Sequence, residues 1–170
     1  MIKKIDNSIF ISGSRSVERL ESLNKEFINW CIYGWKTFLI GDADGVDLLA
    51  QKYLTEKKYH NVTIFTVNNT PRNNIGNFDV TYCKIPEWTF SKAVFGVKDE
   101  EMRKICSEWY VIWDWESKWS EVNIKDLLKK GKRVTIFIDW KNIQWPIEEP
   151  FSKRKLQEKM SIVWQTSLFE

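Results

Sequence analysis

Two glycine-bearing turns, each between an apolar run and a helical pattern, constrain the fold of this chain more than any other feature of its sequence. One turn spans residues 12–16 after the apolar run 9–11, and the other spans residues 41–47 after the apolar run 38–40. A turn that leads from a buried strand into a helix presents backbone N–H groups at the carboxyl edge of a parallel sheet, where anions bind. Two such turns on neighbouring strands predict a pocket for a nucleotide or a phosphate-sugar.

Hydrophobic spacing along the rest of the chain predicts alternating strands and helices. Runs of β-branched and aromatic residues are typical of buried strands, and apolar residues three or four positions apart are typical of helices. The segment 68–85 carries turn-forming Asn, Pro and Gly residues, so we expect a long loop there. The pattern predicts strands at 8–12, 37–40, 62–67, 109–113 and 133–138, and helices at 18–33, 46–58, 98–108, 123–130 and 152–164.

This order of elements predicts an α/β fold, a Rossmann-like three-layer sandwich whose mostly parallel sheet has about five strands. The length of 170 residues suits one well-buried domain. We assign residues 1–140 to that domain and residues 141–170 to a C-terminal helical extension. The extension is expected to pack on the domain or on a second subunit.

Composition and charge argue against several classes of protein. The net charge of +3 is small and its basic residues alternate with acidic ones, so we do not expect nucleic acid as a partner. No apolar run approaches the ~20 residues of a membrane span, and the N-terminus lacks the apolar core of a signal peptide. We therefore expect a cytoplasmic protein with no membrane association. Three widely spaced cysteines and the single His60 predict neither a disulfide framework nor a His/Cys zinc site. We expect no resident metal and no cofactor.

The first turn offers groups that suit an anion. Gly13 lets the backbone turn tightly, while Ser14, Arg15 and Ser16 supply a hydroxyl, a guanidinium and a second hydroxyl near a helix start. A phosphate or a carboxylate fits that set. The same residues also fit a structural role in which a serine caps the helix and Arg15 pairs with a surface acid.

The second turn is the more specific of the two. Its glycines permit close approach of a ligand to the main chain, and acids at a helix start stabilise the helix dipole. Asp44 and Asp47 also suit ribose hydroxyls, or a magnesium ion beside phosphates, although no second acidic cluster supports a dedicated metal site. The candidate ligand-binding residues of this turn are Gly41, Asp42, Ala43, Asp44, Gly45 and Asp47.

Together the two turns resemble signatures of the SLOG superfamily, and most closely those of its small YspA-like branch. Residues 13–15 and 41–47 are similar to the GSR and GGADGAD-type motifs of these proteins. Residues 98–102 resemble the helix before the fourth strand, and residues 113–117 lie where YspA-like chains have a strand ending in an Asp-Gly-x-Ser turn. The resemblance covers residues 7–138.

The chain departs from the family pattern at one place. Where the family has Ser-x-Gly-Thr before a helix, this chain has Ser117, Lys118, Trp119 and Ser120, so an indole replaces the glycine. Trp119 either narrows the site or adds a stacking surface over it, whereas Ser117 and Ser120 keep hydroxyls for an anion. The excess of ten tryptophans in the whole chain likewise fits either core and interface packing or a stacking wall for a base.

The resemblance implies a protein that binds a nucleotide or a nucleotide-derived ligand, as a sensor or a sponge, and that forms a homodimer. SLOG members are associated with nucleotide-derived and NAD-derived signals in bacterial and phage conflict. On this reading phosphate is held by Arg15 and the amides around Ser14, Ser117 and Ser120, ribose by Asp44 or Asp47, and a base by Trp119.

Two other functions stay open. LOG-type enzymes of this superfamily hydrolyse the N-glycosidic bond of a nucleoside 5′-monophosphate with a glutamate that falls on Asn123 here, and an amide is not a general acid or base. Glu121 lies two positions away and points elsewhere on a helix, so the sequence favours binding over turnover. A DprA-type binder of single-stranded nucleic acid is the third reading, which the scattered aromatic and basic residues favour and the weak net charge opposes.

Overall fold

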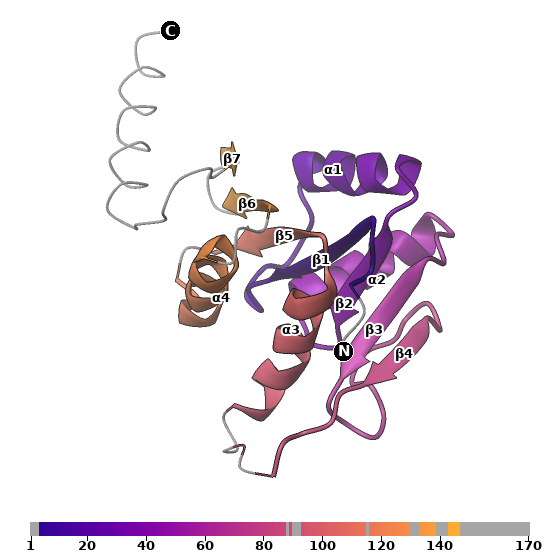
Figure 1. Cartoon of the computed structure of the whole chain (residues 1–170). Coiled ribbons are helices and arrows are strands. Elements are labelled where there is room, and N and C mark those ends of the chain that lie inside the picture. Colours follow the sequence, from indigo (N-terminus) through magenta and orange to yellow (C-terminus); the bar gives the residue numbers. More distant parts are fainter. Residues whose placement is uncertain are drawn as a thin grey trace, which may run out of the picture.

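Seven strands form one sheet, in the order β4-β3-β2-β1-β5-β6-β7, in the computed structural model of the chain (Figure 1). The structure describes residues 4–87, 89, 93–114, 116–129, 133–138 and 143–146. Each neighbouring pair among β1 to β6 is parallel, and β7 is antiparallel to β6. The strands are β1 (Ser8–Gly13), β2 (Thr37–Gly41), β3 (Val62–Thr66), β4 (Asp79–Tyr82), β5 (Glu108–Trp113), β6 (Arg133–Ile138) and β7 (Ile143–Pro146); the helices are α1 (Ser22–Tyr33), α2 (Val46–Glu56), α3 (Val94–Ile105) and α4 (Lys118–Lys129).

Side chains of the central strands alternate between two buried cores, one on each face of the sheet. Ile9 and Ile11 of β1 lie in a core that includes residues of α1 and α2. Phe10 lies in the other core, together with residues of α3 and α4. A parallel strand buried on both faces needs apolar side chains at almost every position, which explains the continuous apolar runs in the sequence. The predicted Rossmann-like sandwich is therefore confirmed.

The order of the strands opens a crevice between β1 and β5. From β1 the chain passes through α1 to β2 on one side, and it later returns through α3 to β5 on the other side (Figure 1). The turns after β1 and β5 leave adjacent strands toward opposite faces of the sheet. In open α/β sheets ligands bind at such a switch point, outside the carboxyl ends of the strands.

Several element boundaries differ from the sequence prediction. β4 lies inside the segment 68–85, which was expected to be a loop. The sequence did not predict this strand because it lies at the edge of the sheet, where most of its side chains are exposed and form no apolar pattern. β4 and β7 bring the sheet to seven strands, against the expected five or so. α1 begins at Ser22 rather than at residue 18, and α4 begins at Lys118 rather than at residue 123. The predicted helix 152–164 and most of the 141–170 extension lie outside the described residues.

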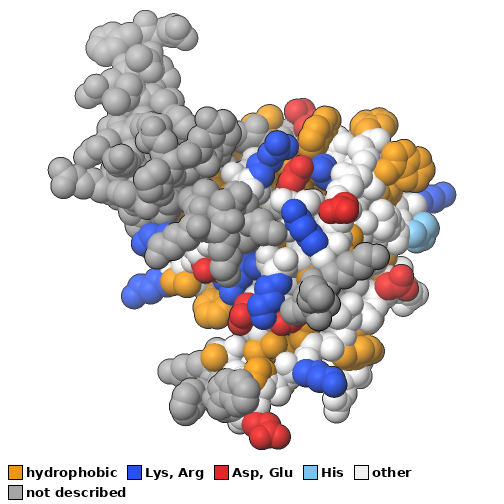
Figure 2. Space-filling view, viewed as in Figure 1, with side chains coloured by type: hydrophobic (Ala, Val, Ile, Leu, Met, Phe, Trp, Pro, Cys, Tyr) orange, Lys and Arg blue, Asp and Glu red, His pale blue; other side chains and the backbone are white. Residues whose placement is uncertain are grey.

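The surface of the described part carries mixed charge. On the face shown in Figure 2, basic and acidic side chains are interspersed, and no large patch of one sign is visible among the coloured residues. Among the helices that the structure describes, none combines the length and the apolar character needed to cross a membrane.

Candidate functional site

The turns after β1, β2 and β5 meet around one cavity of about 510 Å³ at the carboxyl edge of the sheet. Residues from all three predicted segments line it, so these turns lie together as the sequence predicts. The predicted residues that line the cavity are Gly13, Arg15, Ser16, Ala43, Asp47, Ser117, Trp119 and Ser120. The predicted residues Ser14, Gly41, Asp42, Asp44 and Gly45 are not among its lining residues.

The glycines of the two turns allow protein segments to approach each other, whereas the sequence suggested the approach of a ligand. Gly45 has a φ of +72°, and a Cβ there would lie 2.5 Å from the Cα of Arg15. A Cβ on Gly13 would lie 2.1 Å from the carbonyl oxygen of Ile112 in β5. The absence of these side chains is therefore what lets the first turn pack between the second turn and β5.

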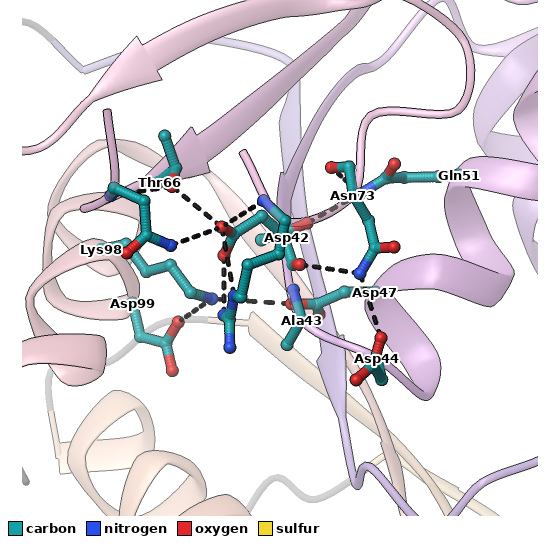
Figure 3. Close-up of polar contacts among 12 residues, drawn as sticks. Asp42, Ala43, Asp44, Asp47, Gln51, Thr66, Asn73, Lys98 and Asp99 are labelled. Carbon is teal, nitrogen blue, oxygen red and sulfur yellow. Dashed lines mark hydrogen bonds and ion pairs between the residues drawn. The ribbon is translucent and has the colours of Figure 1, made fainter. Parts of the chain in front are cut away.

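Asp42 anchors the segment that follows β3. Its fully buried carboxylate accepts hydrogen bonds from Arg72 Nη2 at 2.8 Å, Thr66 Oγ1 at 2.8 Å and Asn68 Nδ2 at 3.3 Å (Figure 3). Arg72 also donates its backbone N–H to the same carboxylate, at 3.1 Å. Burial alone would raise the pKa of Asp42, but the hydrogen bonds from Arg72 and Thr66 lower it to about 2. Asp42 thus holds Arg72 at the cavity wall and does not itself line the cavity.

A buried lysine lies between two carboxylates in the cavity wall. Lys98 Nζ is 3.0 Å from Asp99 Oδ1 and 3.5 Å from Asp47 Oδ2, and all three side chains line the cavity (Figure 3). Burial alone would lower the pKa of Lys98, but the two carboxylates raise it above its ordinary value. Burial raises the pKa of Asp47, an effect that Lys98 partly offsets. A Cβ on Gly41 would lie 2.2 Å from Lys98 Nζ, so this glycine makes room for the ammonium group.

Asp114 joins the turn after β5 to the turn after β1. Its Oδ1 accepts the N–H of Glu116 at 3.0 Å and the N–H of Ser117 at 2.8 Å, and its Oδ2 accepts the Ser16 hydroxyl at 2.5 Å. Its own N–H donates to Ser14 Oγ at 3.1 Å. Burial alone would raise the pKa of Asp114, but the hydrogen bonds from Ser16 and Ser117 keep it below its ordinary value. The carboxylate is therefore ionised at neutral pH.

Three of the amide donors expected to hold phosphate already have acceptors within the protein. The N–H of Ser14 donates to Ile112 O at 3.0 Å, that of Ser117 to Asp114, and that of Ser120 to Ser117 Oγ at 3.3 Å. Because α1 begins only at Ser22, the first turn is not a helix N-terminus, and that part of the prediction is wrong. Arg15, by contrast, is exposed at the cavity wall and forms no ion pair with any described residue.

Trp119 forms part of the wall of the cavity and leaves the hollow open. Its Nε1 donates to Asp99 Oδ2 at 2.9 Å, and its ring lies against Gly96, where a Cβ would be 2.6 Å from the ring. The side chain is 48% exposed, so one side of the indole is available to a ligand. Phe95 also lines the cavity, with the guanidinium of Arg72 4.8 Å from its ring centre.

Asn123 also lies in the cavity wall, at the position that the resemblance gives to the glutamate of LOG-type enzymes. Its side chain is buried, and its Oδ1 accepts a hydrogen bond from Arg103 Nη1 at 2.5 Å. Arg103 also pairs with Asp126 at 3.4 Å. An uncharged amide thus occupies this place, held by a neighbouring guanidinium.

The sequence alone did not single out four charged residues of the wall. Lys98 and Asp99 lie within a run of charged helical residues, which reads as a solvated helix face, and Asp114 was quoted only as part of a strand end. Arg72 lies in a segment whose only signal was turn chemistry. Local sequence gave no signal for these positions, because contacts with segments distant in the chain bury Lys98 and Asp99 and hold Arg72 and Asp114 at the wall.

Neither a search for metal ligands nor comparison with known proteins assigns a further role to the residues of the cavity. Within the described ranges, no group of three or more His, Cys, Asp or Glu side chains is placed to hold a metal ion. Comparisons with family models, with curated proteins and with solved structures gave no match.

Proposed function

We propose that this chain binds a nucleotide or a nucleotide-derived phosphate-sugar ligand, as expected for a SLOG-type protein that acts as a sensor or a sponge. The observation that supports this proposal is the meeting of three turns around one cavity at the β1/β5 switch point. Its volume of about 510 Å³ falls in the range of small-molecule pockets. Its wall combines a guanidinium, carboxylates and an indole, which match the phosphate, sugar and base of a nucleotide.

Each part of the ligand has a preferred contact. Arg15 is the group for a phosphate, because no described carboxylate neutralises it. Asp47 is preferred to Asp44 for a ribose hydroxyl, since Asp47 lines the cavity whereas Asp44 accepts a hydrogen bond from Asn73 at 3.1 Å outside it. Trp119 offers a ring surface for a base, and stacking on an aromatic side chain contributes about 1–3 kcal/mol.

Binding and the role of Arg15 are testable together. Mass spectrometry of the denatured protein identifies any nucleotide that co-purifies, and calorimetric titration then gives its affinity. Arg15→Ala should weaken binding at least tenfold, because a hydrogen bond to a charged group contributes about 1.5–3 kcal/mol. Arg19→Ala is the matched control, since Arg19 is exposed, pairs with Glu21 and does not line the cavity. Equal affinity of Arg15→Ala and the control would count against the phosphate contact.

Hydrolysis of an N-glycosidic bond is a second candidate, favoured by one observation. The carboxylates of Asp47 and Asp99 both line the cavity, so acidic groups are present although Asn123 occupies the place of the family's glutamate. Incubation with AMP, cytokinin-type nucleotides and NAD, followed by chromatography, reports any released base. Release that is lost in Asp99→Asn supports turnover, and no release above background rules this activity out for these substrates.

A further inference from the structure

The charges and hydrogen bonds of the cavity wall restrict the charge of the ligand, whereas the volume of the cavity restricts only its size. Two of the three cationic side chains in the wall already face carboxylates: Arg72 binds Asp42, and Lys98 lies between Asp47 and Asp99. Arg15 is therefore the only lining cation among the described residues that has no carboxylate partner there.

Asp114 takes two of the backbone donors that would otherwise supply positive potential at this edge of the cavity. In nucleotide sites that hold several phosphates, a row of free N–H groups at a turn and a helix start surrounds the anions. Here the N–H groups of Glu116 and Ser117, just before α4, donate to Asp114, and that of Ser120 in the first turn of α4 donates to Ser117 Oγ. A carboxylate of this protein thus occupies two of the donors that a phosphate would otherwise take.

We propose that Asp114 limits the charge of the ligand, so that the cavity accepts a nucleoside or a nucleotide with at most one phosphate and excludes polyphosphates. This inference rests on the proposed function and names the specificity-determining residue of the same site. Arg15 balances one phosphate, and a second or third phosphate meets the Asp114 carboxylate with no further cation to offset the repulsion. Ser16 holds that carboxylate in place through its hydroxyl, at 2.5 Å.

The test compares ligands that differ only in the number of phosphates. Calorimetric titration of the full chain with adenosine, AMP, ADP and ATP, and with the corresponding cytidine series, gives the affinity order at fixed ionic strength. Wild type should bind the nucleoside or the monophosphate tightest and lose affinity with each added phosphate. Asp114→Asn removes the charge but keeps an acceptor for the N–H of Ser117 and a group that bonds to Ser16. It should reduce the ratio of the ATP to the AMP dissociation constant about tenfold.

Control measurements separate the charge limit from general effects. Asp79→Asn removes one negative charge from an exposed position in β4, outside the cavity, and should leave that ratio unchanged. The wild-type affinity order needs no variant, so it tests the proposal even where Asp114→Asn fails to fold.

The outcomes are distinct. Tightest binding of ADP or ATP to wild type overturns the charge limit and leaves the proposed function standing. An unchanged ratio in a folded Asp114→Asn protein overturns the role of Asp114. Binding of no member of either series overturns the charge limit together with nucleotide binding.

Discussion

Replacing Asp42 by Asn tests whether one buried carboxylate fixes the position of the cavity wall. The Asp42 side chain is fully buried and accepts hydrogen bonds from Arg72, Thr66 and Asn68. The substitution keeps the size of the side chain and one acceptor oxygen, but it removes the negative charge and puts an NH₂ group opposite these donors. The predicted result is a lower free energy of unfolding.

The magnitude follows from the structure. A fall in the pKa of Asp42 from 3.8 to about 2 corresponds to roughly 2 kcal/mol of stability from the ionised form. Removing one partner of a buried ion pair costs about 3–5 kcal/mol, and the value here should lie near the lower limit because the side chain of Arg72 is 33% exposed. We therefore expect Asp42→Asn to lose about 2–3 kcal/mol at pH 7.

The pH dependence gives an independent check on the same charge. Because the folded pKa of Asp42 lies below its ordinary value, the stabilisation is complete above pH 3.8 and is lost as the pH falls toward 2. Roughly half of it should be lost at pH 3. Asp42→Asn has no such group, so the difference in unfolding free energy between the two proteins should shrink by about 1 kcal/mol between pH 7 and pH 3.

Urea denaturation, followed by tryptophan fluorescence or circular dichroism, measures both quantities. Asp44→Asn is the matched control, since Asp44 is a neighbouring acid that is exposed and accepts one hydrogen bond, from Asn73. It should change stability by less than about 0.5 kcal/mol. A loss in Asp42→Asn no larger than in this control, or a difference that does not change between pH 7 and pH 3, would refute the reasoning.

Three further predictions concern glycine, lysine and cysteine positions. Gly45→Ala should lower the free energy of unfolding by roughly 3 kcal/mol, because Gly45 has a positive φ and lies against the main chain of the first turn. A free energy of unfolding equal to that of wild type, measured by urea denaturation, contradicts this. Lys98→Met leaves Asp47 and Asp99 buried without their cation and should cost about 3–5 kcal/mol at pH 7. The loss should be smaller at acid pH, because burial raises the pKa of Asp47 and so favours its neutral form, and a loss independent of pH argues against this. Burial raises the pKa of Cys31 to about 12, so its thiol should react with a disulfide reagent at pH 8 only as fast as the protein unfolds, and rapid labelling of the native protein contradicts this.

Local sequence determined the class of fold and the segments that carry the site. Apolar residues at consecutive positions in the central strands must be buried on both faces of a sheet, and helices on both faces are the means of burying them. The glycine turns after residues 11 and 40 then fall at the carboxyl edge of that sheet. These inferences needed only the periodicity of the chain and the conformational freedom of glycine.

Only the tertiary structure decided what the turns do. Whether Gly45 faces a ligand or Arg15, and whether the N–H of Ser117 is free or bound to Asp114, depends on which segments pack together. Asp114 contacts Ser16 across 98 positions of sequence. Lys98 of α3 meets Asp47 of α2 only because these helices, on opposite faces of the sheet, both bring a side chain to Gly41 at the end of β2. Burial and ion pairing of this kind arise from packing between distant segments, so local residue pattern carries no signal of them.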